Sequence, residues 1–177
     1  MSTPQPPEPD TKDWTWVLDR PCAECGFDAS AVRGSEVAAQ LGSATATLRS
    51  AVLAPGSDGR PQPDVWSPLE YGAHVRDAFI VYGTRLASMR HANDPLFPDW
   101  NQDETALAER YWEQDPRKVA DELSTESERI TGDLDGVGVD EWQRPGRRSD
   151  GAVFTIDSLA RYLLHDVVHH LHDVGRG

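Results

Sequence analysis

The stretch that decides the fold runs from Thr155 to Val174 and reads TIDSLARYLLHDVVHHLHDV. Thr155 is of a type that commonly caps a helix, and apolar side chains recur after it at intervals of three and four. This period predicts a helix with one buried stripe. The stripe consists of Ile156, Ala160, Leu163, Val167, Leu171 and Val174.

Two further helices are expected in the first half of the chain. Apolar residues recur with the helical period over residues 30–53, until a loop with three prolines and two glycines ends the pattern. The second helix is expected to follow Ser67 and to run to about Met89. Ser67 can cap it, Pro68 suits its first turn and Glu70 completes a capping box.

A third helical region is expected over residues 104–134. Asp115 and Pro116 mark a restart within it, so the region is one kinked helix or two. Long connections flank it, and no stretch of alternating polarity predicts a strand. The chain is therefore expected to be all-α: a four-helix bundle with long connecting loops, in which a site can form between facing helices.

Length and composition fit one globular domain. The chain has 177 residues, of which 38% are hydrophobic and 27% charged. Residues 1–12 contain four prolines and no large aliphatic side chain besides Met1. They are expected to form a disordered leader, and residues 13–177 the single domain.

Charge and hydropathy exclude two classes of partner. The 30 acidic and 17 basic residues give a formal net charge of −13, which repels nucleic acids and anionic lipid surfaces. No apolar run approaches the roughly 18 residues that would span a bilayer, and the N-terminus lacks the pattern of a secretory signal. We therefore expect a cytoplasmic protein that binds neither nucleic acid nor membrane.

The quoted stretch also carries most of the metal-ligating side chains, since it holds four of the six histidines. His165 and His169 are four residues apart, so they lie on one helix face and can bind the same ion. His74, in the second expected helix, is the natural third ligand. Three protein ligands leave a position open for water or substrate, as in catalytic sites, and imidazole suits zinc, nickel, copper or iron. The sequence thus predicts one divalent metal centre, formed by His74, His165 and His169.

Two other interpretations of these side chains stay open. On an ideal helical wheel His165, His169 and His172 lie roughly opposite the aliphatic stripe, so they also fit a solvent-exposed face. Asp166 and His170 form a second pair four residues apart, nearer the edge of the stripe, which we rank second as a ligand pair.

Several neighbouring residues are candidates for supporting roles. Asp77 and Asp166 lie close in sequence to expected ligands and can accept hydrogen bonds from imidazole N–H groups, as can solvent-exposed carboxylates without such a role. His170 and His172 suit the surface or hydrogen bonds to the ligands. Most of the tryptophans are expected in the core, while Trp100 and Tyr111 are candidates for lining a pocket.

Cys22 and Cys25 are the only cysteines, and two residues separate them. This spacing suits half of a four-ligand zinc site, a redox dithiol or a merely structural loop. A zinc site would need histidines from elsewhere in the chain to complete it, so we favour the structural loop.

Two stretches resemble the metal motifs of the DinB superfamily: residues 66–77 (WSPLEYGAHVRD) and residues 162–170 (YLLHDVVHH). The similarity extends from about residue 14 to 174, including a middle loop at 98–103, and residues 22–28 look like the opening of an actinobacterial subgroup. The resemblance implies a four-helix bundle, often a homodimer, with one divalent ion held by three histidines. They carry over to His74, His165 and His169.

The resemblance implies an activity less directly, because related folds host different reactions. Members include S-transferases that use mycothiol or bacillithiol, and a mycothiol-dependent maleylpyruvate isomerase. The isomerase pattern has a carboxylate where His165 stands, so the sequence departs from it. No catalytic residue is assigned.

The favoured hypothesis is a metal-dependent thiol S-transferase. The ion would bind a low-molecular-weight thiol such as mycothiol, lower its pKa and direct the thiolate at an electrophile. A metal-dependent hydrolase is the main alternative among enzymes. A non-catalytic protein that binds a metal or small ligand is the alternative from another class, and a redox switch at Cys22 and Cys25 is the third.

Overall fold

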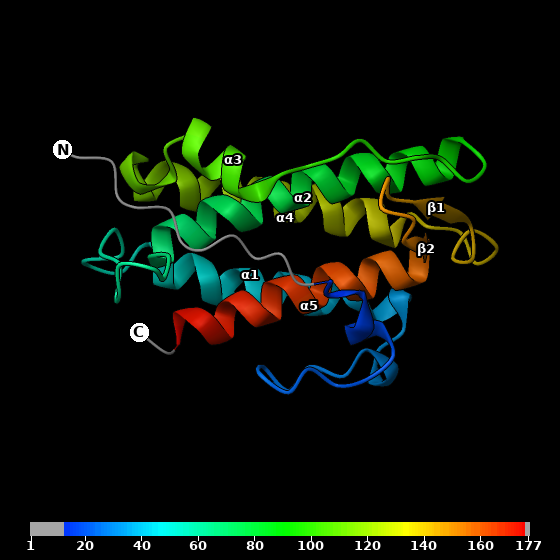
Figure 1. Ribbon diagram of the computed structural model, residues 1–177, viewed down its shortest axis with the longest axis horizontal. Coiled ribbons are helices and arrows are strands. Elements are labelled where there is room, and N and C mark those ends of the chain that lie inside the picture. Colours follow the sequence, from blue (N-terminus) through cyan, green and yellow to red (C-terminus); the bar gives the residue numbers. More distant parts are fainter. Residues whose placement is uncertain (1–12, 176–177) are drawn as a thin grey trace.

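The computed structural model describes residues 13–175, so the expected leader at 1–12 lies outside the described residues. Helices α1 and α2 each pack against both α4 and α5, which confirms the expected all-α four-helix bundle (Figure 1). A short helix, α3 (Gln102–Ala108), lies in the connection between α2 and α4. The four bundle helices are α1 (Val37–Val52), α2 (Pro68–His91), α4 (Pro116–Asp135) and α5 (Ile156–Val174).

Local capping signals fix where the helices begin. The Ser67 hydroxyl accepts the Glu70 amide at 3.2 Å, and the Glu70 carboxylate accepts the Ser67 amide at 2.9 Å, which is the capping box expected for α2. Thr155 caps α5 by accepting the Ser158 amide at 3.1 Å. Asp115 caps α4, so the third helical region is divided as the Asp-Pro restart suggested.

The N-terminal segment runs along α5 before α1 begins (Figure 1). It contains three 3-10 turns, η1 (Thr15–Leu18), η2 (Ala29–Ala31) and η3 (Gly34–Glu36), where the sequence predicted a helix from residue 30. Two contacts hold this segment on α5: the Gly34 amide donates to Asp157 at 2.7 Å, and Arg161 donates to the Ala29 carbonyl at 3.1 Å. The cysteine loop is thereby placed beside the last helix.

A small antiparallel hairpin corrects the expectation that the chain has no strands. It pairs β1 (Pro145–Arg147) with β2 (Val153–Thr155), with Gly146 opposite Phe154. Strands of three residues are too short to show an alternating pattern in the sequence. Because β2 ends at the residue that caps α5, the hairpin helps to set the position of that helix.

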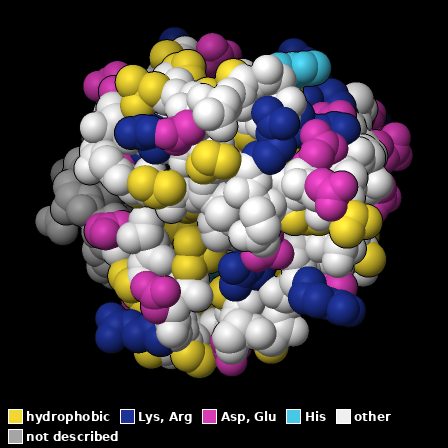
Figure 2. Space-filling model, turned by 90° about the vertical axis from the view of Figure 1, so that its right-hand side faces the viewer, with side chains coloured by type: hydrophobic (Ala, Val, Ile, Leu, Met, Phe, Trp, Pro, Cys, Tyr) yellow, Lys and Arg dark blue, Asp and Glu magenta, His cyan; other side chains and the backbone are white. Residues whose placement is uncertain are grey.

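On the face shown in Figure 2, basic and acidic side chains are interspersed and no extended patch of one sign is formed. In the described part of the chain, every helix is too short or too polar to cross a membrane.

A 3-10 turn, η4 (Tyr111–Glu113), completes the connection between α3 and α4.

Candidate metal centres

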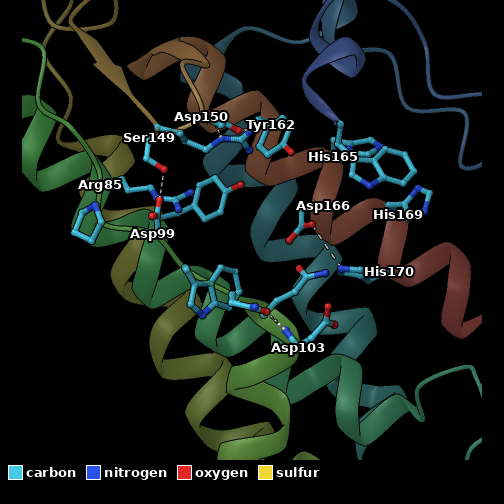
Figure 3. Close-up of a pocket in the computed structure, with 17 residues that line it drawn as sticks. Arg85, Asp99, Asp103, Ser149, Asp150, Tyr162, His165, Asp166, His169 and His170 are labelled. Carbon is cyan, nitrogen blue, oxygen red and sulfur yellow. Dashed lines mark hydrogen bonds and ion pairs between the residues drawn. The ribbon is translucent and has the colours of Figure 1, made fainter. Parts of the chain in front are cut away.

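Helix α5 carries two pairs of ligand-type side chains that are offset by a single residue, His165 with His169 and Asp166 with His170. One residue corresponds to a rotation of about 100° around an α-helix. The two pairs therefore point in different directions. In Figure 3, His165 and His169 lie near the blue N-terminal segment, and Asp166 and His170 lie further into the cavity.

Two groups of residues bring ligand atoms within 4.8 Å of one another in the described structure. The thiol cluster consists of Cys22, Cys25, His165 and His169. The carboxylate cluster consists of His74, Asp166 and His170. The structure thus brings two of the predicted histidines together and places the third, His74, with the pair that sequence reasoning ranked second.

The solvent-exposed interpretation of the histidines does not fit the structure. His165 is 4% exposed and His169 is 9% exposed, although both point away from the aliphatic stripe. The N-terminal segment covers this side of α5, with the ring centroid of Trp14 at 5.6 Å from that of His165 and 4.9 Å from that of His169.

The spacing of the carboxylate cluster fits a bound divalent ion. His74 Nε2 lies 3.7 Å from one oxygen of Asp166, and His170 Nε2 lies 3.5 Å from the other. Two ligands at about 2.1 Å from a tetrahedral ion are separated by about 3.4 Å. On its far side, His170 Nδ1 lies 3.4 Å from Asp173 Oδ2, the type of contact that orients a metal-binding imidazole.

His74 gives a second reason to expect an ion. Its side chain is fully buried, and neither ring nitrogen has a hydrogen-bond partner among the described residues. The rings of Trp100 and Trp66 lie against it, with centroids at 5.6 Å and 5.3 Å. A buried polar atom without a partner is costly, and coordination of an ion removes that cost.

Electrostatics in the carboxylate cluster couple its three members. Burial lowers the pKa of His74, and Asp166 only partly opposes this shift. Burial alone would lower the pKa of His170 as well, but the carboxylates of Asp166 and Asp173 raise it to about 9. Burial disfavours the charged form of Asp166, yet His170 and His74 hold its pKa well below the usual range. Without an ion, the cluster therefore holds a proton that an ion can replace.

A cavity of about 530 Å³ opens beside the carboxylate cluster (Figure 3). Asp166 and His170 line it, together with Trp100 as the sequence suggested. The fully buried His74 is not part of the lining and closes the cluster from behind. The wall also includes His165 and His169 of the thiol cluster. Charged and aromatic side chains complete it, among them Arg85, Asp103, Arg148 and Tyr162.

Three other candidates lie outside both clusters. Asp77 accepts a hydrogen bond from Arg76 Nε at 2.8 Å and another from the Tyr111 hydroxyl. Both of these hydrogen bonds go to side chains other than a histidine. Tyr111 is fully buried and does not line the cavity. His172 belongs to neither cluster.

The two cysteines are free thiols in the described structure. Burial raises the pKa of Cys25 to about 11, so this thiol keeps its proton at neutral pH when no ion is bound. Reactive dithiols instead depend on a lowered thiol pKa. The structure therefore gives little support to the redox switch.

Comparisons with known proteins agree with this fold. A family model described as the DinB superfamily matches residues 56–174, more than half of the chain. Among solved structures, YfiT from Bacillus subtilis superimposes with a TM-score of 0.71 at 17% identity, covering 81% of this chain and 84% of YfiT. YfiT is described as "a probable metal-dependent hydrolase with an unusual four-helix bundle topology". No match was found among curated proteins. With the family motifs on α2 and α5 and the family match over both helices, this chain belongs to the DinB superfamily.

Proposed function

We propose that this protein is a metal-dependent enzyme whose centre is the carboxylate cluster. His74, Asp166 and His170 would hold a divalent ion such as zinc or nickel. This assignment keeps His74 from the three-histidine prediction and replaces His165 and His169 by the pair one residue further along α5. The observation that carries it is the contrast within the cluster: His74 is fully buried behind it, while Asp166 and His170 face the cavity.

Three protein ligands suit catalysis because they leave part of the coordination sphere to a small molecule. A divalent ion at this position supplies Lewis-acid chemistry and lowers the pKa of the molecule that binds beside it. Asp166 is the only anionic member of the cluster, so its single negative charge leaves the loaded site with a net positive charge. The site therefore favours an anion in the cavity.

We propose further that this anion is the thiolate of a low-molecular-weight thiol such as mycothiol, which attacks a small electrophile. The cavity of about 530 Å³ falls in the size range of ligand pockets, roughly 300–1,000 Å³. Its wall combines the cations Arg85 and Arg148 with the carboxylate of Asp103 and the ring of Trp100. Such a lining suits a polar cosubstrate that carries both hydroxyl and charged groups.

A metal-dependent hydrolase is the second candidate. It is favoured by the similarity in fold to YfiT, for which that activity is suggested. In a hydrolase the open side of the cluster would bind water in place of the thiol, and the cavity would hold only the molecule to be cleaved. A non-catalytic binding protein is less favoured, because the cluster opens on a cavity of ligand size.

Parallel assays on zinc-loaded protein without a histidine tag separate these functions. One assay supplies mycothiol, glutathione or cysteine with 1-chloro-2,4-dinitrobenzene and follows the thioether, in which a C–S bond replaces the C–Cl bond. The other supplies activated esters without thiol. We expect thioether formation that is lost in Asp166→Asn and His170→Ala and retained in the control His91→Ala, an exposed histidine at the end of α2. Ester cleavage alone would favour the hydrolase, and no turnover in either assay would contradict an enzyme of these classes.

A further inference from the structure

The thiol cluster joins two segments that are far apart in the sequence. Cys22 and Cys25 come from the loop between η1 and η2, and His165 and His169 come from α5. Cys22 Sγ lies 3.7 Å from His169 Nδ1. A thiolate at about 2.3 Å and an imidazole at about 2.1 Å from a tetrahedral zinc ion are separated by about 3.6 Å. The observed spacing is therefore that of two ligands of one ion.

The cysteine loop has the backbone that such a pair needs. The Cys22 amide donates to the Phe27 carbonyl at 2.8 Å, and the Gly26 amide donates to the Cys22 carbonyl at 2.8 Å. Gly26 has a φ of +77°, a conformation that glycine adopts without the strain of a side chain. This tight turn directly after Cys25 allows both sulfur atoms to reach the same two histidines.

His165 gives a further reason to expect an ion in this cluster. Its side chain is 96% buried, because only 4% of its surface is exposed, and Nε2 has no hydrogen-bond partner in the described structure. The rings of Trp14 and Phe27 lie against it, with centroids at 5.6 Å and 5.7 Å. A ring nitrogen of His165 nevertheless lies within 4.8 Å of the ligand atoms of both cysteines and His169.

On the side facing away from Cys22, the His169 ring lies beside carboxylates, as is common for metal-binding imidazoles. While Nδ1 faces Cys22, Nε2 lies 3.6 Å from a carboxylate oxygen of Glu24 and 3.9 Å from Asp173. Carboxylates in this position fix the orientation of the ring and strengthen it as a ligand. Glu24 stands between the two cysteines in sequence, so the loop that supplies the sulfur ligands also orients a histidine.

We propose that Cys22, Cys25, His165 and His169 form a second metal site, a structural zinc site. Four protein ligands complete a tetrahedral sphere and leave no position for substrate. On binding, the two thiols release their protons to solvent, and Zn²⁺ with two thiolates and two neutral imidazoles is uncharged. A neutral complex can be buried without the cost of an isolated charge. The ion fastens the N-terminal segment to α5, and this role does not depend on the proposed enzyme activity.

Metal content and cobalt spectroscopy test this site separately from the carboxylate cluster. Protein without a histidine tag is loaded with Zn²⁺ or Co²⁺ and compared with Cys22→Ser/Cys25→Ser, His74→Ala and the control His91→Ala. We expect the cysteine variant to lose one zinc per chain and to lose the thiolate-to-cobalt charge-transfer band. His74→Ala should keep that band whatever happens at the carboxylate cluster, and His91→Ala should match the unmodified protein.

A measurement on the unmodified chain keeps the proposal testable if the cysteine variant does not fold. In zinc-loaded protein both thiols should resist alkylation by N-ethylmaleimide, and both should react after a strong chelator is added. Rapid alkylation of both cysteines in the loaded protein would overturn the proposal. So would a cobalt spectrum without a sulfur charge-transfer band, or a Cys22–Cys25 disulfide in protein purified with zinc.

Discussion

The thiol cluster and the carboxylate cluster are neighbours on α5, yet their surroundings shift the pKa of a histidine in opposite directions. In the thiol cluster, burial, followed by the nearby His169, lowers the pKa of His165 to about 4. In the carboxylate cluster, Asp166 and Asp173 overcome burial and raise the pKa of His170 to about 9. A step of a few residues along one helix thus changes an imidazole from a neutral group into a cation when no ion is bound.

The two clusters also differ in how much of an ion they can enclose. Both clusters contribute side chains to the cavity wall, but the thiol cluster offers four ligands while the carboxylate cluster offers three. The number of protein ligands separates structural from catalytic zinc sites, since a fourth ligand takes the position that a catalytic site keeps open. The comparison therefore favours a structural role for the thiol cluster, holding the N-terminal segment on α5, and a chemical role, in catalysis, for the carboxylate cluster.

The largest expected effect tests the chemical role. In Asp166→Asn the carboxylate cluster loses its only anionic ligand, so its metal affinity and kcat/KM should both fall by more than about 100-fold, beyond the effect of removing a supporting residue. Zinc titration and steady-state kinetics measure this. The matched control is Asp121→Asn, at an exposed position on α4. Equal activity of Asp166→Asn and the control would remove Asp166 from the centre.

The holding role predicts a difference in thermal stability. A chelator should lower the Tm of the unmodified protein and of Asp166→Asn by at least about 10 °C. An ion present at several hundred times its Kd stabilises the fold by about 3–4 kcal/mol, and each kcal/mol shifts the Tm by about 2–4 °C. In Cys22→Ser/Cys25→Ser the same chelator should change the Tm by less than half as much. Calorimetry with and without chelator gives both values. Equal chelator effects in the two variants would contradict the division of roles.

A smaller effect is expected from Asp173, which lies behind the carboxylate cluster. Asp173→Asn removes the carboxylate beside His170 Nδ1 and should weaken metal binding there by about 10- to 100-fold. Binding of Co²⁺, followed by its visible spectrum, measures the affinity. If the variant bound Co²⁺ as tightly as the unmodified protein, the orientation of His170 would not depend on this contact.

The smallest effect concerns protonation in the metal-free protein. His170 should stay protonated until the pH passes about 9, while His165 should stay neutral until the pH falls to about 4. The raised pKa of His170 stabilises the fold fully below about pH 6.5 and is lost as the pH rises through 9. The lowered pKa of His165 has the opposite sign: its contribution is present above about pH 6.5 and is lost as the pH falls toward 4. NMR of the imidazole protons measures both, and two ordinary values near 6.5 would erase the contrast.

Much of the fold could be predicted because its signals are local. Ser67 and Thr155 cap their helices through residues three positions away, so the sequence contains both partners of each contact. The hairpin at β1 and β2 could not be predicted, because three-residue strands carry no period. The late start of α1 also depends on a distant contact, between Gly34 and Asp157.

The candidate sites were only partly accessible to sequence reasoning. Helical spacing identified the ligand pairs on α5 and indicated that His165 and His169 point away from the aliphatic stripe. It could not reveal that the N-terminal segment, instead of water, covers that side. The path of this segment depends on contacts such as that of Arg161 with Ala29, which are 132 residues apart. One signal for two sites was present in the sequence. Two i, i+4 pairs of ligand-type residues overlap in one stretch of α5, and each pair needs further ligands from another segment.

A single oxygen atom connects the two clusters. Asp173 Oδ2 lies 3.4 Å from His170 Nδ1 and 3.9 Å from His169 Nε2, so it faces the outer nitrogen of one imidazole from each site. Filling either site changes how strongly the imidazole of that site shares its proton with the Asp173 carboxylate. The same carboxylate then interacts more weakly or more strongly with the imidazole of the other site. Such coupling is reciprocal by thermodynamic linkage. Zinc uptake by this protein is then expected to be cooperative, because occupancy of the thiol cluster changes the zinc affinity of the carboxylate cluster.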